Sequence, residues 1–380
     1  MARPFRALGG FLLASCVAVS DFESDFADND WIIFRGSPSL SGYVDRALPD
    51  NPKLHWTFSN DVRTVSSPII YGDKAYTCDR KGVVRGIDEQ GKQFFSHNLN
   101  TTVEASFIIR DSVMYIGKID GKITALSLST KKILWEYETL GQISASPNII
   151  QHEADELLLI GSYDNSMYTF STSSGKKVSQ FETGYYINGA ASVWGNYMLF
   201  GGCDGWLRMV NTITGEQTDS MQLKAYVPAS PAVMGDYAFV SDYNGNLYEL
   251  QLADGRIAKH RLLITAKEGE ESSGVVSMPT VSANAIYILT NDRHIRCIER
   301  SNGKERWSKM LRGDAGESAP LVCKDKVLVC TKDGYVSILS ADNGKEVWHY
   351  EVGEQIIASP AVLSDCFYIQ TSRGKLLMFK

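Results

Sequence analysis

Short apolar stretches separated by polar turns recur along most of the chain, at a spacing of roughly 40 residues. Each of eight copies opens with a small residue, usually followed by proline. An apolar strand, a turn and a second apolar strand come next, as in ASPAVMGDYAFVS at residues 229–241. Proline fits at the start of a strand because no ladder hydrogen bond is lost there. The pattern predicts β-strands throughout and contains no convincing amphipathic helix.

A second turn follows in every copy, and most of its dipeptides tolerate the positive φ angles of a two-residue hairpin. The eight turns are Lys81-Gly82, Asp120-Gly121, Asp164-Asn165, Asp204-Gly205, Asn244-Gly245, Asp292-Arg293, Asp333-Gly334 and Arg373-Gly374. A third turn, of the kind SNGKE, recurs in only seven copies. Four short antiparallel strands per copy are typical of propeller blades, so we predict an all-β, eight-bladed β-propeller.

The last copy ends after its third strand, at the C-terminus of the chain. The stretch PKLHWTFSN, residues 52–60, has the pattern of an outer strand but no first three strands of its own. Because an unpaired sheet edge is a liability, we expect residues 51–60 to complete the last blade and close the ring. Residues 31–50 then form a leading segment, and residues 31–380 form a single propeller.

Tryptophan occupies the same place in four outer strands, at Trp56, Trp135, Trp307 and Trp348. A stacking surface for a ligand is one interpretation of these rings. Their regular recurrence favours a structural role instead, in which each ring docks between neighbouring blades and buries a large apolar area.

The first residues of the chain resemble a targeting signal. Arg3 and Arg6 precede an apolar run that is too short to span a bilayer. A plain cleaved secretory signal is one interpretation. Residues 13–16, Leu-Ala-Ser-Cys, resemble the bacterial lipobox, so we expect a lipoprotein signal peptide at residues 1–15 and lipidation of Cys16. Residues 16–30 are acidic and contain no strand-length apolar run, which predicts a solvated tether.

Composition excludes several functions. The 380 residues are 44% hydrophobic, enough for a sizeable core, and carry a formal net charge of −6. No run of Lys or Arg could follow a phosphate backbone, which argues against nucleic acid as a partner. Most of the seven cysteines lie in apolar strands, as small buried hydrophobes do, and their spacing selects no disulfide. The histidines lack metal-ligand spacing, and no P-loop or G-x-S-x-G elbow is present.

Two stretches, ADNGKEVW at residues 341–348 and SNGKERW at 301–307, resemble the tryptophan-docking repeat of the quinoprotein-like propellers. The resemblance covers residues 31–380 and implies the fold rather than the function. One branch of this family consists of pyrroloquinoline-quinone (PQQ) dehydrogenases. The chain lacks their vicinal cysteine pair and any C-x-x-C-H haem motif, and no stretch matches their calcium-binding and catalytic carboxylates. The other branch is the propeller lipoprotein of the machinery that assembles outer-membrane β-barrels.

Resemblance to the second branch implies a non-enzymatic scaffold that needs no cofactor and no metal. We expect a monomeric propeller in the bacterial envelope, held to the outer membrane by its lipid and facing the periplasm. Its partner would be a protein such as a barrel-inserting protein. Two alternatives stay open: a PQQ-dependent oxidoreductase with PQQ and calcium, and a propeller that binds a glycan or peptide at the mouth of its channel.

The stretch LRGDAGESAP, residues 311–320, resembles a loop of the assembly lipoprotein that touches its barrel-inserting partner. The resemblance implies partner-binding roles for Arg312 and Glu317. Residues are inserted between Gly313 and Glu317, however, and the stretch lies in the seventh copy, so an ordinary inter-blade loop is the alternative. The loop at residues 267–274 is a second candidate, because loops on rigid scaffolds often carry binding.

The leading segment contains WIIFRGSPSLSGY, residues 31–43, which resembles the opening of many secreted members of the same family. We expect Trp31 and Phe34 to be apolar anchors. Arg35 and Gly36 are predicted to form a turn in which the arginine is paired with an opposite charge.

Overall fold

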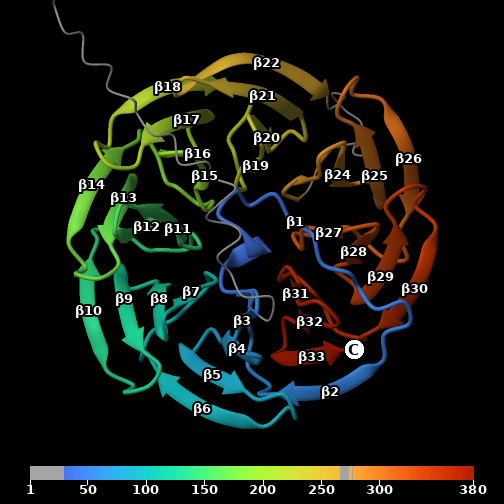
Figure 1. Ribbon diagram of the computed structural model, residues 1–380, viewed down its shortest axis with the longest axis horizontal. Helices are drawn as coiled ribbons and strands as arrows, with labels where there is room; N and C mark the ends of the chain where they lie inside the picture. Colours follow the sequence, from blue (N-terminus) through green and yellow to red (C-terminus); the bar gives the residue numbers. More distant parts are fainter. Residues whose placement is uncertain (1–29, 266–273, 276) are drawn as a thin grey trace, which may run out of the picture.

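The computed structural model describes residues 30–265, 274–275 and 277–380. These residues form eight four-stranded antiparallel sheets arranged as blades around a common centre (Figure 1), which confirms the predicted propeller. Helical geometry is confined, within this described part, to one short turn, η1 (Phe34–Gly36). The signal peptide, Cys16 and residues 267–273 of the second candidate loop lie outside the described residues.

The first four blades follow one another along the chain, each running from the centre of the ring to its rim. Their strands are β3 (Ile69–Tyr71), β4 (Lys74–Cys78), β5 (Val83–Ile87) and β6 (Gln93–Asn98) in blade 1; β7 (Ile108–Arg110), β8 (Val113–Gly117), β9 (Lys122–Ser127) and β10 (Ile133–Glu138) in blade 2; β11 (Asn148–His152), β12 (Asp155–Gly161), β13 (Ser166–Ser171) and β14 (Lys177–Glu182) in blade 3; and β15 (Ser192–Trp194), β16 (Tyr197–Gly201), β17 (Trp206–Asn211) and β18 (Gln217–Gln222) in blade 4.

The last four blades continue the same order and complete the circle. Their strands are β19 (Ala232–Met234), β20 (Tyr237–Ser241), β21 (Leu247–Ala253) and β22 (Arg256–Ile264) in blade 5; β23 (Thr280–Val281), β24 (Ala285–Thr290), β25 (His294–Glu299) and β26 (Glu305–Met310) in blade 6; β27 (Leu321–Cys323), β28 (Lys326–Cys330), β29 (Tyr335–Ser340) and β30 (Glu346–Glu351) in blade 7; and β31 (Ala361–Val362), β32 (Phe367–Gln370), β33 (Lys375–Phe379) and β2 (Leu54–Ser59) in blade 8.

Strand β2 confirms the predicted closure of the ring. It is the outer strand of blade 8 and pairs antiparallel with β33, with Thr57 opposite Leu377. Lys53 and Lys380 exchange both main-chain hydrogen bonds, at 2.8 and 3.0 Å, so the residue before β2 is fixed to the residue after β33. Figure 1 shows the two segments side by side at the seam.

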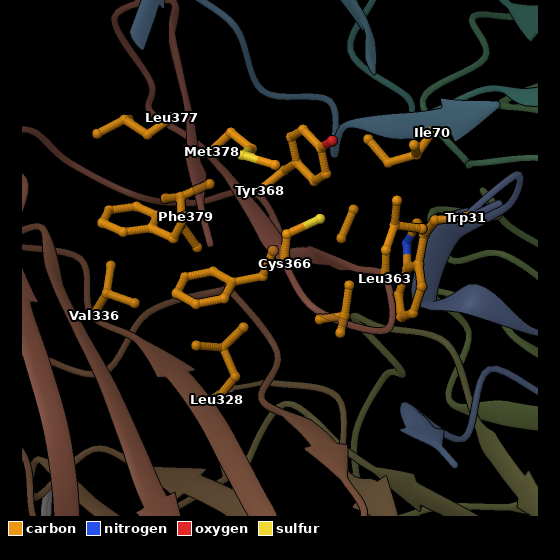
Figure 2. Packing of buried hydrophobic residues seen from close by; sticks show 14 of the residues in the cluster. Trp31, Ile70, Leu328, Val336, Leu363, Cys366, Tyr368, Leu377, Met378 and Phe379 are labelled. Atoms are coloured by element: carbon orange, nitrogen blue, oxygen red, sulfur yellow. The ribbon is translucent and has the colours of Figure 1, made fainter. Parts of the chain in front are cut away.

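The core is divided among the junctions between blades, because each blade buries its faces only against its neighbours. At the seam, side chains from blades 7, 8 and 1 meet in one buried cluster (Figure 2). Phe379 of β33 is fully buried there, in the same cluster as Leu328 of blade 7, while Trp31 lies beside Ile70 of blade 1. Joining three blades in one apolar cluster stabilises the place where the circle closes.

The leading segment passes through the centre of the ring, where Figure 1 shows it in blue. Its residues 43–44 form β1 (Tyr43–Val44), which adds a fifth, parallel strand to the inner edge of blade 7. The repeat pattern did not predict this strand. We call residues 31–48 the hub segment, because they are surrounded by all eight blades.

The hub segment corrects one sequence-based expectation. Arg35 is fully buried, but among the described residues no carboxylate contacts it, so the predicted paired charge is wrong. The guanidinium donates instead to the carbonyls of Leu40 (2.9 Å), Ser41 (3.1 Å) and Pro279 (3.1 Å), and to the hydroxyl of Thr280 (2.8 Å). Burial lowers the pKa of Arg35 to about 9. Trp31, one of the two expected anchors, is only 2% exposed.

Candidate partner-binding face

The two faces of the ring differ in what they present. One face, which we call the loop face, carries the turns between the second and third strands of each blade and the loops that join one blade to the next. In all eight blades a turn N–H donates to a carbonyl of the preceding inter-blade loop, at 2.8–3.1 Å. Examples are Tyr163 to Gln142 and Tyr243 to Tyr226. The opposite face, the turn face, carries the remaining hairpin turns. Because every inter-blade loop is hydrogen-bonded to a turn, the loops of the loop face are held on a rigid base.

Exposed tyrosines gather on the loop face over blades 3 to 5. Tyr163 and Tyr186 stack with ring centroids 5.1 Å apart, and Tyr185 meets Tyr186 edge to face at 5.4 Å. Tyr226 and Tyr243 form a second stack at 4.3 Å. We call these five residues the tyrosine patch. Tyr185, Tyr186 and Tyr243 are 55%, 47% and 63% exposed, an unusual amount of aromatic surface to leave in water.

Cys203, in the turn of blade 4, connects the two stacks. Its N–H donates to the carbonyl of Tyr186 at 3.1 Å. On the other side of the same turn, the N–H of Val227, the residue after Tyr226, donates to the carbonyl of Gly202 at 3.2 Å. The two tyrosine stacks therefore lie on either side of the blade 4 turn.

An ion pair supports the turn beneath this surface. Arg208 reaches Asp204 with two hydrogen bonds, at 3.0 and 2.5 Å, and the N–H of Trp206 donates to the same carboxylate at 3.2 Å. Burial alone would raise the pKa of Asp204, but these hydrogen bonds outweigh it and the pKa lies below its usual value. Both side chains are at most 15% exposed. This largely buried ion pair therefore fixes the turn that carries Cys203.

Arg312 and Glu317 also lie on the loop face, in the loop that joins blade 6 to blade 7 and away from the tyrosine patch. Both are exposed. Arg312 is oriented by contacts within the chain, because its guanidinium binds Glu346 of β30 at 2.6 Å and lies 3.3 Å from His349. Burial would raise the pKa of Glu346, but hydrogen bonds from Arg312 and Ser337 lower it below its usual value.

The four outer-strand tryptophans lie at blade junctions. Trp135 and Trp307 each rest on the glycine of the third turn in the next blade and donate their indole N–H to a backbone carbonyl, at 3.0 and 2.9 Å. Trp56 rests on the corresponding glycine of blade 1 across the seam. Trp348 has no such turn to meet, because the third and fourth strands of blade 8, β33 and β2, are not consecutive in the chain. Its half-buried ring packs against Phe367 and Phe379.

A serine takes the same place in a blade without tryptophan, which the sequence pattern did not reveal. Ser179 of β14 donates its hydroxyl to the carbonyl of Thr212 at 2.8 Å. In the repeat this carbonyl corresponds to Thr172 O and Ala341 O, the acceptors for the indoles of Trp135 and Trp307. These three junctions share a bonded carbonyl, while the side chain that donates to it differs.

Metal-ligating side chains, cysteines and the central channel are the places to look for a cofactor site. The described residues include no group of three or more His, Cys, Asp or Glu side chains that could hold a metal ion. The six described cysteines are all free thiols. No helix in the described part of the chain is long and apolar enough to cross a membrane. Ile33, Arg35 and Leu40 of the hub segment are fully buried in the channel. A quinone in that channel would need the space that these side chains fill, so the residues present do not fit such a group.

A family model and a solved structure point to the same protein family. A sequence model described as outer membrane protein assembly factor BamB matches residues 80–277 and 261–380. No curated protein sequence matches the chain. Among solved structures, BamB from Moraxella catarrhalis is similar with a TM-score of 0.71 and 19% identity, covering 87% of this chain and 99% of that one.

Catalytic propellers are similar in fold as well. The quinohemoprotein alcohol dehydrogenase from Comamonas testosteroni has a TM-score of 0.77 at 11% identity, covering 96% of this chain and 83% of that one. A europium-containing methanol dehydrogenase has a TM-score of 0.77 at 12% identity, with 95% and 99% covered. At such low identity these likenesses describe the fold, and the function has to be argued from the site.

Proposed function

The chain belongs to the family of the outer membrane protein assembly factor BamB, and from this premise we propose that it is a non-enzymatic envelope scaffold that binds a protein partner through its loop face. The tyrosine patch is the observation that carries the proposal. Tyrosine supplies large contact area at low conformational cost, and aromatic residues are enriched at the energetic centres of protein interfaces. A barrel-inserting protein of the outer membrane is the partner that the family suggests.

The geometry of the ring supports this role. Loops that are bonded to the turns of every blade need little ordering when a partner binds, which lowers the entropic cost of association. Arg312 and Glu317 extend the proposed contact surface around the loop face to the loop between blades 6 and 7, with Arg312 held in place by Glu346. The channel filled by the hub segment favours a scaffold over an oxidoreductase or a channel-mouth binder.

The direction of the tether also favours partner binding at the loop face. Asp30, the first described residue, lies on the turn face, where its carboxylate accepts the N–H of Gly72 at 2.7 Å. The chain therefore enters the hub from the turn face. With lipidated Cys16 in the outer membrane, the turn face would be drawn toward the bilayer and the tyrosine patch would point into the periplasm.

Capture of the barrel-inserting protein from membranes of the same organism tests the proposal. We expect Tyr186→Ala and Tyr243→Ala each to reduce capture by roughly tenfold or more, the loss typical of a central interface aromatic. Phe94→Ala is the matched control, because Phe94 is 46% exposed but lies on the outer strand β6. Equal capture by all three variants would refute a role for the tyrosine patch.

Anchoring is tested separately. Cys16→Ala should leave the protein soluble or retained with its signal uncleaved, as fractionation and mass measurement would show. A variant that is processed and anchored like the parent would remove the lipid from the proposal while leaving the loop face untouched.

A further inference from the structure

The innermost strand of each blade has an edge that faces the channel, and such an edge can bind another chain through main-chain hydrogen bonds. In six blades the residue at one fixed position of the repeat donates its N–H to a carbonyl of the hub segment. These bonds run from Ile70 to Trp31 (3.0 Å), Ile109 to Ile32 (3.1 Å), Val193 to Pro38 (3.0 Å), Val233 to Ser39 (2.8 Å), Val281 to Ser41 (2.9 Å) and Val322 to Gly42 (2.9 Å). The hub segment thus passes the blades in their order along the chain.

The two remaining blades reach the hub segment through side chains. In blade 3 the amide of Asn148 accepts the N–H of Ile149 at 2.7 Å and donates to the carbonyl of Pro38 at 2.8 Å, so it stands between strand and segment. In blade 8 the carbonyl of Val362 accepts a hydrogen bond from Arg46 at 2.9 Å. All eight blades therefore contact the segment through hydrogen bonds.

Side chains of the hub segment fit the channel closely. Leu40 is fully buried among the small or flexible residues that open blades 4, 6 and 7, namely Ala190, Met278 and Ala319. Gly42 has a φ of 70°, and a Cβ at this position would overlap the guanidinium of Arg35. The channel consequently selects the sequence of the segment as well as its backbone.

We propose that the centre of the ring is a binding site for a polypeptide, and that the protein's own residues 31–48 occupy it as an intramolecular ligand. The ligand class is a winding peptide with small residues at the contacts and one arginine that spans from the peptide to blade 6. Main-chain recognition by strand edges gives affinity, and Arg35 together with Gly42 gives specificity. The site is distinct from the loop face and does not depend on the proposed scaffold function.

The ring can close without a covalent link to the hub segment. Strand β2 pairs with β33 through its own bonds, and the connection between the two parts runs through Asp50 and Asn51, which are exposed. Cutting the chain there would leave the closing strand on the ring and the hub segment bound only by non-covalent contacts. The N-terminal piece would then behave as a ligand does.

The experiment uses the full chain with a specific protease site inserted between Asp50 and Asn51. After folding and cleavage, a fluorescent synthetic peptide of residues 30–48 is added in excess, and its exchange into the cut protein is followed by polarisation. Peptides with Arg35→Ala or Gly42→Ala, and a scrambled peptide, serve as matched controls. We expect the natural sequence to exchange in and both variants to bind at least roughly tenfold more weakly, because each disturbs buried hydrogen bonds to a charged group.

The outcomes separate clearly. Retention of the N-terminal piece after cutting, followed by its replacement with the natural peptide alone, supports an intramolecular ligand. Unfolding of the cut protein would overturn the proposal, because the segment would then be an inseparable part of the fold. Equal uptake of the scrambled peptide, or no uptake after the N-terminal piece has left, would also overturn it.

Discussion

Substituting alanine for Gly344 tests how tightly the blades dock, because the structure offers a matched control. Gly344 lies in the turn between β29 and β30 with a φ of 69°, and an added Cβ would lie 2.5 Å from the indole ring of Trp307. Gly353 has almost the same φ, 73°, but an added Cβ there would meet no atom within 4 Å. Both substitutions share the left-handed backbone cost of about 1–2 kcal/mol. Only Gly344→Ala also pushes the docked ring.

The size of the difference follows from two contributions. Forcing extra atoms into a packed junction costs about 1–3 kcal/mol. Moving the indole also weakens the hydrogen bond from Trp307 Nε1 to the carbonyl of Ala341, now 2.9 Å, which contributes about 0.5–1.5 kcal/mol. We therefore expect Gly344→Ala to destabilise by about 1.5–4.5 kcal/mol more than Gly353→Ala.

Denaturant midpoints at an unchanged slope are the appropriate measurement, since a changed slope would mean that the unfolding reaction itself had changed. A double-mutant cycle sharpens the test. In a Trp307→Ala background the ring is gone, so Gly344→Ala should cost only the backbone contribution of about 1–2 kcal/mol. Equal costs for the two glycines in the parent, or an undiminished cost of Gly344→Ala in the Trp307→Ala background, would refute the docking account.

Other perturbations have smaller or more global effects. Removing residues 51–60 exposes the outer edge of β33, so we expect aggregation and a lower melting temperature, and a truncated protein that melts like the parent would contradict the seam. Arg312→Glu breaks an exposed ion pair with Glu346, so stability should fall by about 1 kcal/mol or less while partner capture weakens; unfolding, or capture at the parent level, would count against this contact. Trp348→Ala should cost less than the roughly 3–5 kcal/mol typical of a fully buried aromatic, because its ring is half-buried. A denaturant midpoint shifted by that full amount or more would contradict this expectation.

The repeated part of the fold could be predicted from sequence because local signals agree there. Turn dipeptides such as Asn244-Gly245 fix the hairpins, and the alternating strands between them can only be buried against neighbouring blades. The closing strand was predictable for the same reason, since β2 carries the outer-strand pattern without the rest of a blade. Each of these inferences needs only the period of the repeat.

The hub segment could not be predicted, because its structure depends on partners spread over the whole chain. Arg35 hydrogen-bonds to Thr280, which lies 245 residues away, and its left-handed conformation leaves no periodic signal. The same holds for the tyrosine patch: the stack of Tyr226 on Tyr243 joins two loops that are adjacent only after blade 5 has formed. Sequence reasoning therefore selected a loop by resemblance, and the exposed aromatic surface became visible only in three dimensions.

Acid should weaken the loop face through Asp204, which holds the turn beneath the tyrosine patch. Burial opposes ionisation, yet hydrogen bonds from Arg208 and Trp206 lower the folded-state pKa below the unfolded value of about 3.9. A depressed carboxylate pKa stabilises the fold fully above the unfolded pKa, and this contribution is lost as the pH falls through the folded pKa. Hydrogen bonds to a charged group are worth about 1.5–3 kcal/mol, which bounds the effect.

The comparison of the parent with Asp204→Asn isolates this carboxylate. The difference in unfolding free energy between the two should be constant from pH 7 down to about 5, and should shrink below about pH 4 as Asp204 becomes protonated in the parent. Asp236 provides the control, because it is a carboxylate of the turn face whose contact, with the indole of Trp194 at 3.2 Å, is exposed. Asp236→Asn should show a much smaller difference at neutral pH. If the Asp204→Asn difference instead grew toward acid, the carboxylate would be destabilising when ionised, and the ion pair with Arg208 could not be what holds the turn under the tyrosines.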